Sequence, residues 1–286
     1  MSAALIDLVS VGAQDVYITG DPQVSFFRQN YKRHTNFSIK PERMDYIGTF
    51  QSGNEVSIPI KSKGDLLSYV WIENANINSR NNNASIFSDA TASETSPTEF
   101  SLWIGGQEVT KLDTLFINTV HNTLYNESSA KATCAMTTQD GGDNAPTGSY
   151  IIPFFFSEDW TKSLPLVGLQ YHEVEIRIKF RNGTFSLGSS PKVYGSYVFV
   201  DTDEREFFAN GEHELLITQT QHQPMSASDT SIDLTYFNHP VKAVHIAAGN
   251  KLTTSYEFTD ASMFINGVPL FENMTHEYHR NVVPSR

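Results

Sequence analysis

The chain has 286 residues, of which 39% are hydrophobic and only 18% charged, and this length allows a large core without disulfides. Its 32 acidic and 20 basic residues give a net charge of −12, which opposes contact with nucleic-acid phosphates, so no direct genome binding is expected. The single cysteine, Cys134, excludes an internal disulfide and with it a disulfide-stapled secreted scaffold.

The N-terminal region is not typical of a signal peptide, because it lacks a basic n-region and includes Asp7 and Asp15. No part of the chain has the roughly 20 apolar residues of a membrane span. Aromatic and basic side chains cluster at Phe26, Phe27, Arg28, Tyr31, Lys32 and Arg33. This mixture resembles a nucleic-acid-binding surface. The acidic balance of the chain favours the alternative, in which the rings pack onto a domain or a neighbouring subunit.

Alternating apolar and polar residues predict a strand at residues 54–61, and a further strand is expected at residues 66–73. Residues 78–98 are rich in Asn, Ser and Thr and predict a long exposed loop. Another strand is expected at residues 100–104. In residues 111–125 the apolar side chains recur mainly three or four positions apart, which predicts a short amphipathic helix inserted between strands.

The strand pattern resumes after a second polar loop at residues 126–148. In residues 174–181 apolar and charged side chains alternate without exception, which predicts a strand with one buried face, and Asn182-Gly183 then favours a tight turn. Further strands are expected at residues 150–156 and 193–200. Short strands separated by turn residues predict an all-β sandwich or barrel.

An acidic stretch at residues 201–214 marks a boundary, and we interpret it as a solvated connector. A metal site at Asp201, Asp203 and Glu204 is the alternative. It has little support, because the glycine of an EF-hand loop is absent. Beyond the connector, strands are expected at residues 215–219, 232–236, 241–246 and 262–265.

The sequence shows no pattern of an enzyme site. His172-Glu173 would need a second histidine four positions after the first to resemble a zinc protease, and Ile176 stands there instead. His276 and His279 have a helical spacing without an evident third ligand. The lone cysteine has no neighbouring histidine, and both the GxSxG elbow and the phosphate-binding glycine loops are absent. A protein that is not an enzyme and has no cofactor is therefore expected.

Sequons for N-glycosylation occur at Asn36, Asn83, Asn126, Asn182 and Asn273. Most arise by chance in a chain so rich in Asn and Ser, and they matter only if the protein meets a glycosylation machinery. Asn83, Asn126 and Asn182 are the candidate sites.

Several strings of residues together resemble one protein family. The first string, at residues 12–37, resembles the N-terminal signature of the major capsid proteins of nucleocytoplasmic large DNA viruses, particularly those that infect algae. It reads GAQDVYITGDPQVSFFRQNYKRHTNF. Further blocks of the family resemble SGNEVSIPIKSKGDLL, LWIGGQEV, IIPFFFS, LPLVGLQYHEVEIRI, YVFVDTDEREFFANGEHELLI, FNHPV and FINGVPLF, in this order. Because the blocks follow one another from residue 12 to residue 271, the resemblance is specific.

The resemblance implies a double jelly-roll fold and a place in the virion. Three chains, each with two eight-stranded jelly rolls, would form a pseudo-hexagonal capsomer of an icosahedral shell. The implied partners are two further copies, neighbouring capsomers and minor capsid proteins, and assembly would take place in the host cytoplasm. The N-terminal segment would face the shell interior. Its six aromatic and basic residues then become candidate assembly contacts with neighbouring subunits, minor capsid proteins or the underlying membrane.

We divide the chain into an N-terminal segment at residues 1–25, a complete first jelly roll at 26–211 and a partial second jelly roll at 212–286. The last part offers four or five strands, whereas a jelly roll takes eight. The missing strands would come from a second polypeptide, from further chain or from a neighbouring subunit. Residues 212–286 should therefore not form a closed domain alone.

Two other functions compete with a capsid role. A jelly-roll lectin would bind carbohydrate through its aromatic and Asn-rich loops. A metal-dependent β-sandwich enzyme has the least support, because the sequence contains no His-x-His pair.

Overall fold

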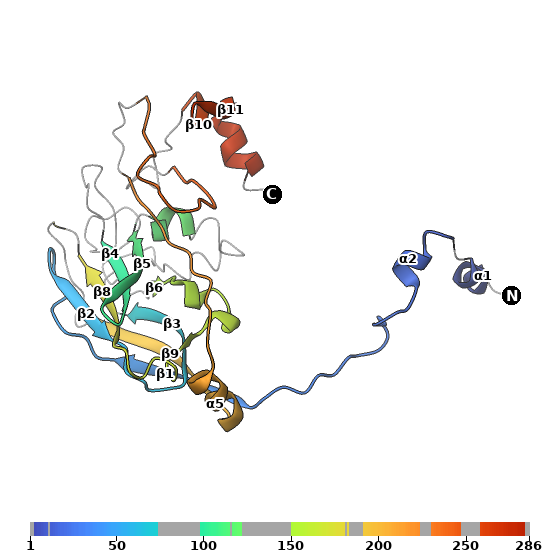
Figure 1. The fold of residues 1–286 in the computed structure, drawn as a ribbon, viewed down its shortest axis with the longest axis horizontal. Coiled ribbons are helices and arrows are strands. Elements are labelled where there is room, and N and C mark those ends of the chain that lie inside the picture. Colours follow the sequence, from blue (N-terminus) through green and yellow to red (C-terminus); the bar gives the residue numbers. More distant parts are fainter. Residues whose placement is uncertain are drawn as a thin grey trace, which may run out of the picture. The chain divides into compact units, whose positions relative to one another are not determined.

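The computed structural model describes residues 3–10, 12–73, 98–114, 116–121, 150–180, 182, 191–223, 230–246 and 258–283. Met1–Asn36 and Phe37–Arg286 form two separate compact units. In the first unit, helices α1 (Ala3–Val9) and α2 (Val16–Thr19) precede an extended stretch, and all described side chains are exposed (Figure 1). Helices this short are marginal in water without packing partners.

The second unit is built on a sandwich of two antiparallel sheets (Figure 1). The five-stranded sheet has the order β1 (Phe37–Met44), β9 (Lys192–Val200), β3 (Leu66–Glu73) and β6 (Tyr150–Ile152), with β7 (Leu164–Pro165) also paired to β3. The four-stranded sheet has the order β2 (Glu55–Pro59), β8 (Val174–Lys179), β4 (Glu99–Ile104) and β5 (Gln107–Asp113). From β1 to β4 each strand lies in the sheet opposite its predecessor, as in a jelly roll. The all-β class and the complete first jelly roll are confirmed.

The inward faces of the two sheets share one core. In β8, Val174, Ile176 and Ile178 are buried, while the charged residues between them face outward as their alternation predicted. Across the sandwich, Phe100 of β4 stacks on Tyr150 of β6 with ring centroids 5.7 Å apart. Both rings are fully buried. Burial of apolar surface contributes roughly 25 cal/mol per Å², so this core stabilises the packing of the two sheets against each other.

The helix expected at residues 111–125 begins later in the structure, and residues 122–125 lie outside the described residues. Residues 111–113 belong to β5, where Leu112 lies opposite Phe100. The helical segment is the π-helix η1 (Phe116–His121), and the Asp113 carboxylate accepts a hydrogen bond from the Phe116 amide at 2.6 Å. The prediction was wrong for the first turn, because backbone pairing with β4 outweighs a local helical pattern.

Two polar loops expected from the sequence fall largely outside the described residues, at 74–97 and 122–149. After the second gap, the strand expected at residues 150–156 ends already at Ile152. The short helices η2 (Phe155–Ser157) and η3 (Trp160–Lys162) follow, and Phe155 and Phe156 are buried in the core.

Beyond β9 the structure differs most from the prediction. The acidic connector begins with helix α5 (Thr202–Asn210), whose first amide donates to the Asp201 carboxylate at 2.7 Å. The strands expected at residues 215–219, 232–236 and 241–246 are absent, so these three predictions were wrong. The expected strand at residues 262–265 is part of β10 (Asp260–Ile265), which pairs with β11 (Val268–Thr275), and η4 (Tyr278–Val282) follows. Among the described residues, no helix has the length and apolar character to cross a bilayer.

A buried tyrosine gives the sandwich a predicted sensitivity to alkaline pH. Burial, together with the nearby Glu42 carboxylate, raises the pKa of Tyr197 from 10.0 to about 12. The unfolded chain therefore loses this proton first, and the free energy of unfolding should fall as pH rises between these two values. We expect a loss of about 1 kcal/mol between pH 10 and pH 11 from this group. Urea unfolding at the two pH values, compared with Tyr197→Phe, measures it, and an equal pH slope in both proteins would contradict the assignment.

Candidate assembly surfaces

The candidate contact residues of the N-terminal segment are all exposed in the first unit. Phe26 and Phe27 show essentially their entire side chains, and Tyr31 is 87% exposed. Arg28, Lys32 and Arg33 are exposed as well. Within the unit the structure gathers these side chains into no packed cluster, so their role as assembly contacts stays a prediction.

Of the three candidate glycosylation sites, only Asn182 lies among the described residues. It is exposed just beyond β8, next to the turn at Gly53. Asn83 and Asn126 lie outside the described residues. Glycosylation at all three sites stays a prediction.

The outer face of the four-stranded sheet carries charges that are largely satisfied within the face. Ser57 donates to the Glu175 carboxylate at 2.6 Å, and the Arg177 Nε donates to the same carboxylate at 2.7 Å. Partial burial opposes ionisation of Glu175, but these hydrogen bonds outweigh it, so the pKa of Glu175 lies below its ordinary value. The Arg177 guanidinium also lies over the Trp103 ring, 4.2 Å from its centroid. A Lys111–Glu99 ion pair at 2.8 Å completes this network.

The outer face of the five-stranded sheet has a different character. One outward residue on each of four neighbouring strands lies in register with the next: Arg43 of β1, Tyr194 of β9, Trp71 of β3 and Ile151 of β6. Trp71 stacks on Tyr194 with ring centroids 5.4 Å apart, and Tyr69 lies at the same distance from Trp71. We call the surface formed by Arg43, Tyr69, Trp71, Ile151, Lys192 and Tyr194 the aromatic face.

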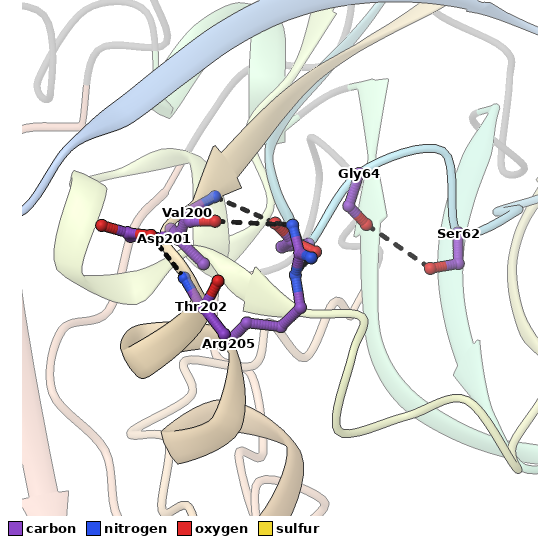
Figure 2. Close-up of polar contacts among 7 residues, drawn as sticks. Ser62, Gly64, Val200, Asp201, Thr202 and Arg205 are labelled. Carbon is purple, nitrogen blue, oxygen red and sulfur yellow. Dashed lines mark hydrogen bonds and ion pairs between the residues drawn. The ribbon is translucent and has the colours of Figure 1, made fainter.

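An ion pair anchors α5 to the sandwich at the end of β9. The Arg205 guanidinium donates to both carboxylate oxygens of Asp65, at 2.9 and 3.0 Å, and the Val200 amide donates to the same carboxylate at 2.9 Å. The hydrogen bonds and the negative charge of Asp65 raise the pKa of Arg205 above its ordinary value. Asp65 is only 8% exposed. Figure 2 shows Arg205 reaching back from α5 beside Val200, so the direction in which the chain leaves the first jelly roll is set by this contact.

Asp65→Asn should loosen this junction. The amide keeps the shape of the side chain but loses its charge and one acceptor, so we expect a loss of about 1.5–3 kcal/mol in the free energy of unfolding. Hydrogen exchange in α5 should become faster. Asp201→Asn is the matched control, because asparagine caps a helix about as well as aspartate. Equal effects of the two variants in urea unfolding would show that the Asp65–Arg205 pair does not hold α5.

Residues after α5 lie along the free edge of β5. Gln219 Nε2 donates to the Val109 carbonyl at 2.6 Å, and Thr220 Oγ1 donates to the Lys111 carbonyl at 2.7 Å. His222 and Asp113 approach to 3.6 Å at the end of the same strand. Side chains thus occupy backbone acceptors that an exposed edge strand would otherwise offer to other chains.

The hydrogen bonds at Asp65 and along β5 could not be found from the sequence. No local sequence pattern indicates that Asp65 contacts Arg205, or that residues 218–222 contact β5, because each contact joins segments more than a hundred residues apart.

The described residues hold no cluster of three or more His, Cys, Asp or Glu side chains arranged to bind a metal ion.

Comparisons with known proteins agree on one family. Residues 25–201 match the family described as "Major capsid protein N-terminus". The chain belongs to this capsid-protein family. A major capsid protein of Pyramimonas orientalis virus is 33% identical to it over 99% of this chain and 76% of its own length. The major capsid protein of Paramecium bursaria Chlorella virus 1 is 31% identical over 85% of this chain and 60% of its own length.

Solved structures of capsid proteins have a similar fold. The VP54 protein of PBCV-1, as fitted into a reconstruction of the virophage Sputnik, superposes with a TM-score of 0.54 at 26% identity. A quasi-atomic model of the PBCV-1 capsid gives a TM-score of 0.53 at 27% identity. Each similarity covers 68% of this capsid protein and only 50% of the solved chain.

The family decides between the competing functions. Its named members are structural capsid proteins of large DNA viruses, so this capsid protein is a virion component and not an enzyme. The comparisons also favour the shell role over the lectin alternative. The sequence resemblance to the capsid proteins of nucleocytoplasmic large DNA viruses is confirmed.

Proposed function

We propose that this capsid protein forms trimers that tile an icosahedral shell as pseudo-hexagonal capsomers. The match of residues 25–201 to the capsid family carries the proposal, since it covers the whole closed sandwich. A subunit of this kind works through its surfaces, and many modest contacts between identical copies add up to a stable shell. Neighbouring capsomers are then its main partners, and assembly takes place in the host cytoplasm.

The exposed N-terminal residues are proposed to contact minor capsid proteins or neighbouring subunits. Phe26 and Phe27 are large apolar side chains with no packing partner in the first unit, and Arg28, Lys32 and Arg33 add positive charge. Exposed rings of this size become stabilising once a partner removes them from water. We also propose the domain division at residues 1–25, 26–211 and 212–286.

Residues 212–286 are proposed to receive additional strands in the assembled protein. The described part contains one hairpin, β10–β11, and large apolar side chains are exposed in it: Leu216, Val268 and Leu270 are between 62% and 85% exposed. A two-stranded hairpin alone is marginal in water. A second polypeptide, further chain or a neighbouring subunit would cover these side chains and complete a second jelly roll.

Native mass spectrometry of the full chain tests the trimer. The expected species has three times the chain mass of 32.0 kDa, and obligate contacts in it should bury several thousand Å² in total. A stable monomer at micromolar concentration, in a buffer in which intact shells persist, would contradict the trimer. A second polypeptide that completes the second jelly roll would add its own mass to each subunit.

A further inference from the structure

We propose that the aromatic face is a surface on which a second copy of this chain docks. The inference rests on the proposed shell function and adds to it the part of the subunit that makes the contact. It concerns the outer face of the five-stranded sheet, where Arg43, Trp71 and Tyr194 lie in register on three neighbouring strands.

The two outer faces of the sandwich differ in how far their polar groups are satisfied. On the four-stranded sheet, Glu175 and Arg177 bind each other, and Ser57 also donates to Glu175. Docking a partner there would remove these charges from water, and burying an ion pair gains little because desolvation opposes it. This face therefore suits exposure to solvent.

The aromatic face suits burial. Tyr69 is 41% and Ile151 37% exposed, although both lie on strands whose other face is the core. The polar group of Trp71 is already paired, because its Nε1 donates to the Glu73 carboxylate at 3.0 Å. A partner can thus cover the ring without leaving a buried donor unsatisfied. Aromatic residues and arginine are enriched in the buried centres of protein interfaces.

Charge favours a second copy as the occupant. The chain carries a net charge of −12, so two copies repel each other over most of their surfaces. On the aromatic face the sign is reversed, because Arg43 and Lys192 outnumber Glu73. Neither cation forms an ion pair within the described part of the chain. An acidic surface of another copy is therefore attracted to this face, and complementary charge also steers association.

Photo-cross-linking in assembled shells tests the contact directly. A benzophenone amino acid replaces Tyr69 in the full chain, and shells are assembled from an equal mixture of unlabelled and ¹⁵N-labelled chains. Cross-linked peptide pairs of mixed isotope content are expected, because they arise only between two copies. The same probe at Lys179, which is exposed on the four-stranded sheet, is the control and should yield few such pairs.

Charge variants provide the second readout. Arg43→Gln combined with Lys192→Gln should lower shell yield at least about tenfold. Lys162→Gln combined with Lys179→Gln removes the same charge elsewhere and should leave the yield within about twofold. Both variants should keep the thermal stability of the parent, since all four side chains lie outside the core.

The outcomes separate the inference from the proposed function. If the parent chain forms no shell, either alone or with the other capsid proteins of the virus, the proposed function fails. If shells form but the Tyr69 probe yields only peptides of its own copy, of another protein or of lipid, the docking of a second copy is overturned. Formed shells in which the probe cross-links to nothing overturn it as well.

Discussion

Phe100→Ala is expected to lower the free energy of unfolding by about 3–5 kcal/mol, which is a large share of the net stability of a domain. Phe100 is fully buried in β4 between Ile178 of β8 and Leu112 of β5, and it stacks on Tyr150 of the opposite sheet. Alanine would leave a cavity at the place where the two sheets meet. The first jelly roll should then unfold at markedly lower urea concentration, and shell yield should fall with it.

Tyr171→Ala is the matched control for this variant, because the Tyr171 side chain is 90% exposed. It should change the free energy of unfolding by no more than about 0.5 kcal/mol. If Phe100→Ala and Tyr171→Ala unfold at the same urea concentration, the residues described as the core do not hold the sandwich together.

The second large effect is expected in hydrogen exchange of residues 212–246. Most described side chains in this region are exposed, and the described part of its backbone, residues 212–223 and 230–246, forms no strand. In the unassembled chain these amides should exchange close to the unprotected rate, whereas amides of β3 and β9 stay protected as an internal reference. Assembly should slow exchange in residues 212–246 by about a hundredfold or more if strands are added there.

This comparison uses the full chain in both states, so nothing depends on a fragment folding alone. Strong protection throughout residues 212–286 in the isolated monomer would contradict the need for additional strands. Fast exchange in the assembled shell would contradict the proposal that assembly completes a second jelly roll.

The first jelly roll was largely predictable because its strands are buried on one face. In β8 the alternation of apolar and charged residues matches the alternation of buried and outward side chains. The strand β1 was missed, because only Met44 of its residues is buried and Pro41 and the charged residues around it hide the pattern. Edge strands with proline are protected from pairing with other chains, and this protection also makes them difficult to recognise.

Hairpin turns gave signals that could have located two further strands. Gly105 and Gly106 both have positive φ angles, of 59° and 81°, and join β4 to β5. Asn266 and Gly267, at 51° and 78°, join β10 to β11 in the same manner. Two-residue turns of this kind are typical of β-hairpins, so each turn could have predicted that the residues after it return as a strand, although no strand was expected there.

The region after α5 was predicted poorly for a physical reason. Residues 215–219 and 241–246 are rich in Leu, Ile and Val, but a strand forms only when a neighbouring strand satisfies its backbone groups. The side chains of Gln219 and Thr220 instead bind carbonyls of β5. The aromatic face was missed for a related reason, because it depends on the register of four strands and not on any one of them.

Cryo-electron microscopy of purified virus particles tests the central claim most directly. The account predicts a shell of pseudo-hexagonal capsomers, in which the sandwich formed by the sheets β1-β9-β3-β6 and β2-β8-β4-β5 fits the density at each of three equivalent positions. Side-chain density for the stacked pair Phe100 and Tyr150 would identify this chain among other capsid proteins. A shell whose density is fully accounted for by other polypeptides, with this chain absent from the particle, would contradict the account.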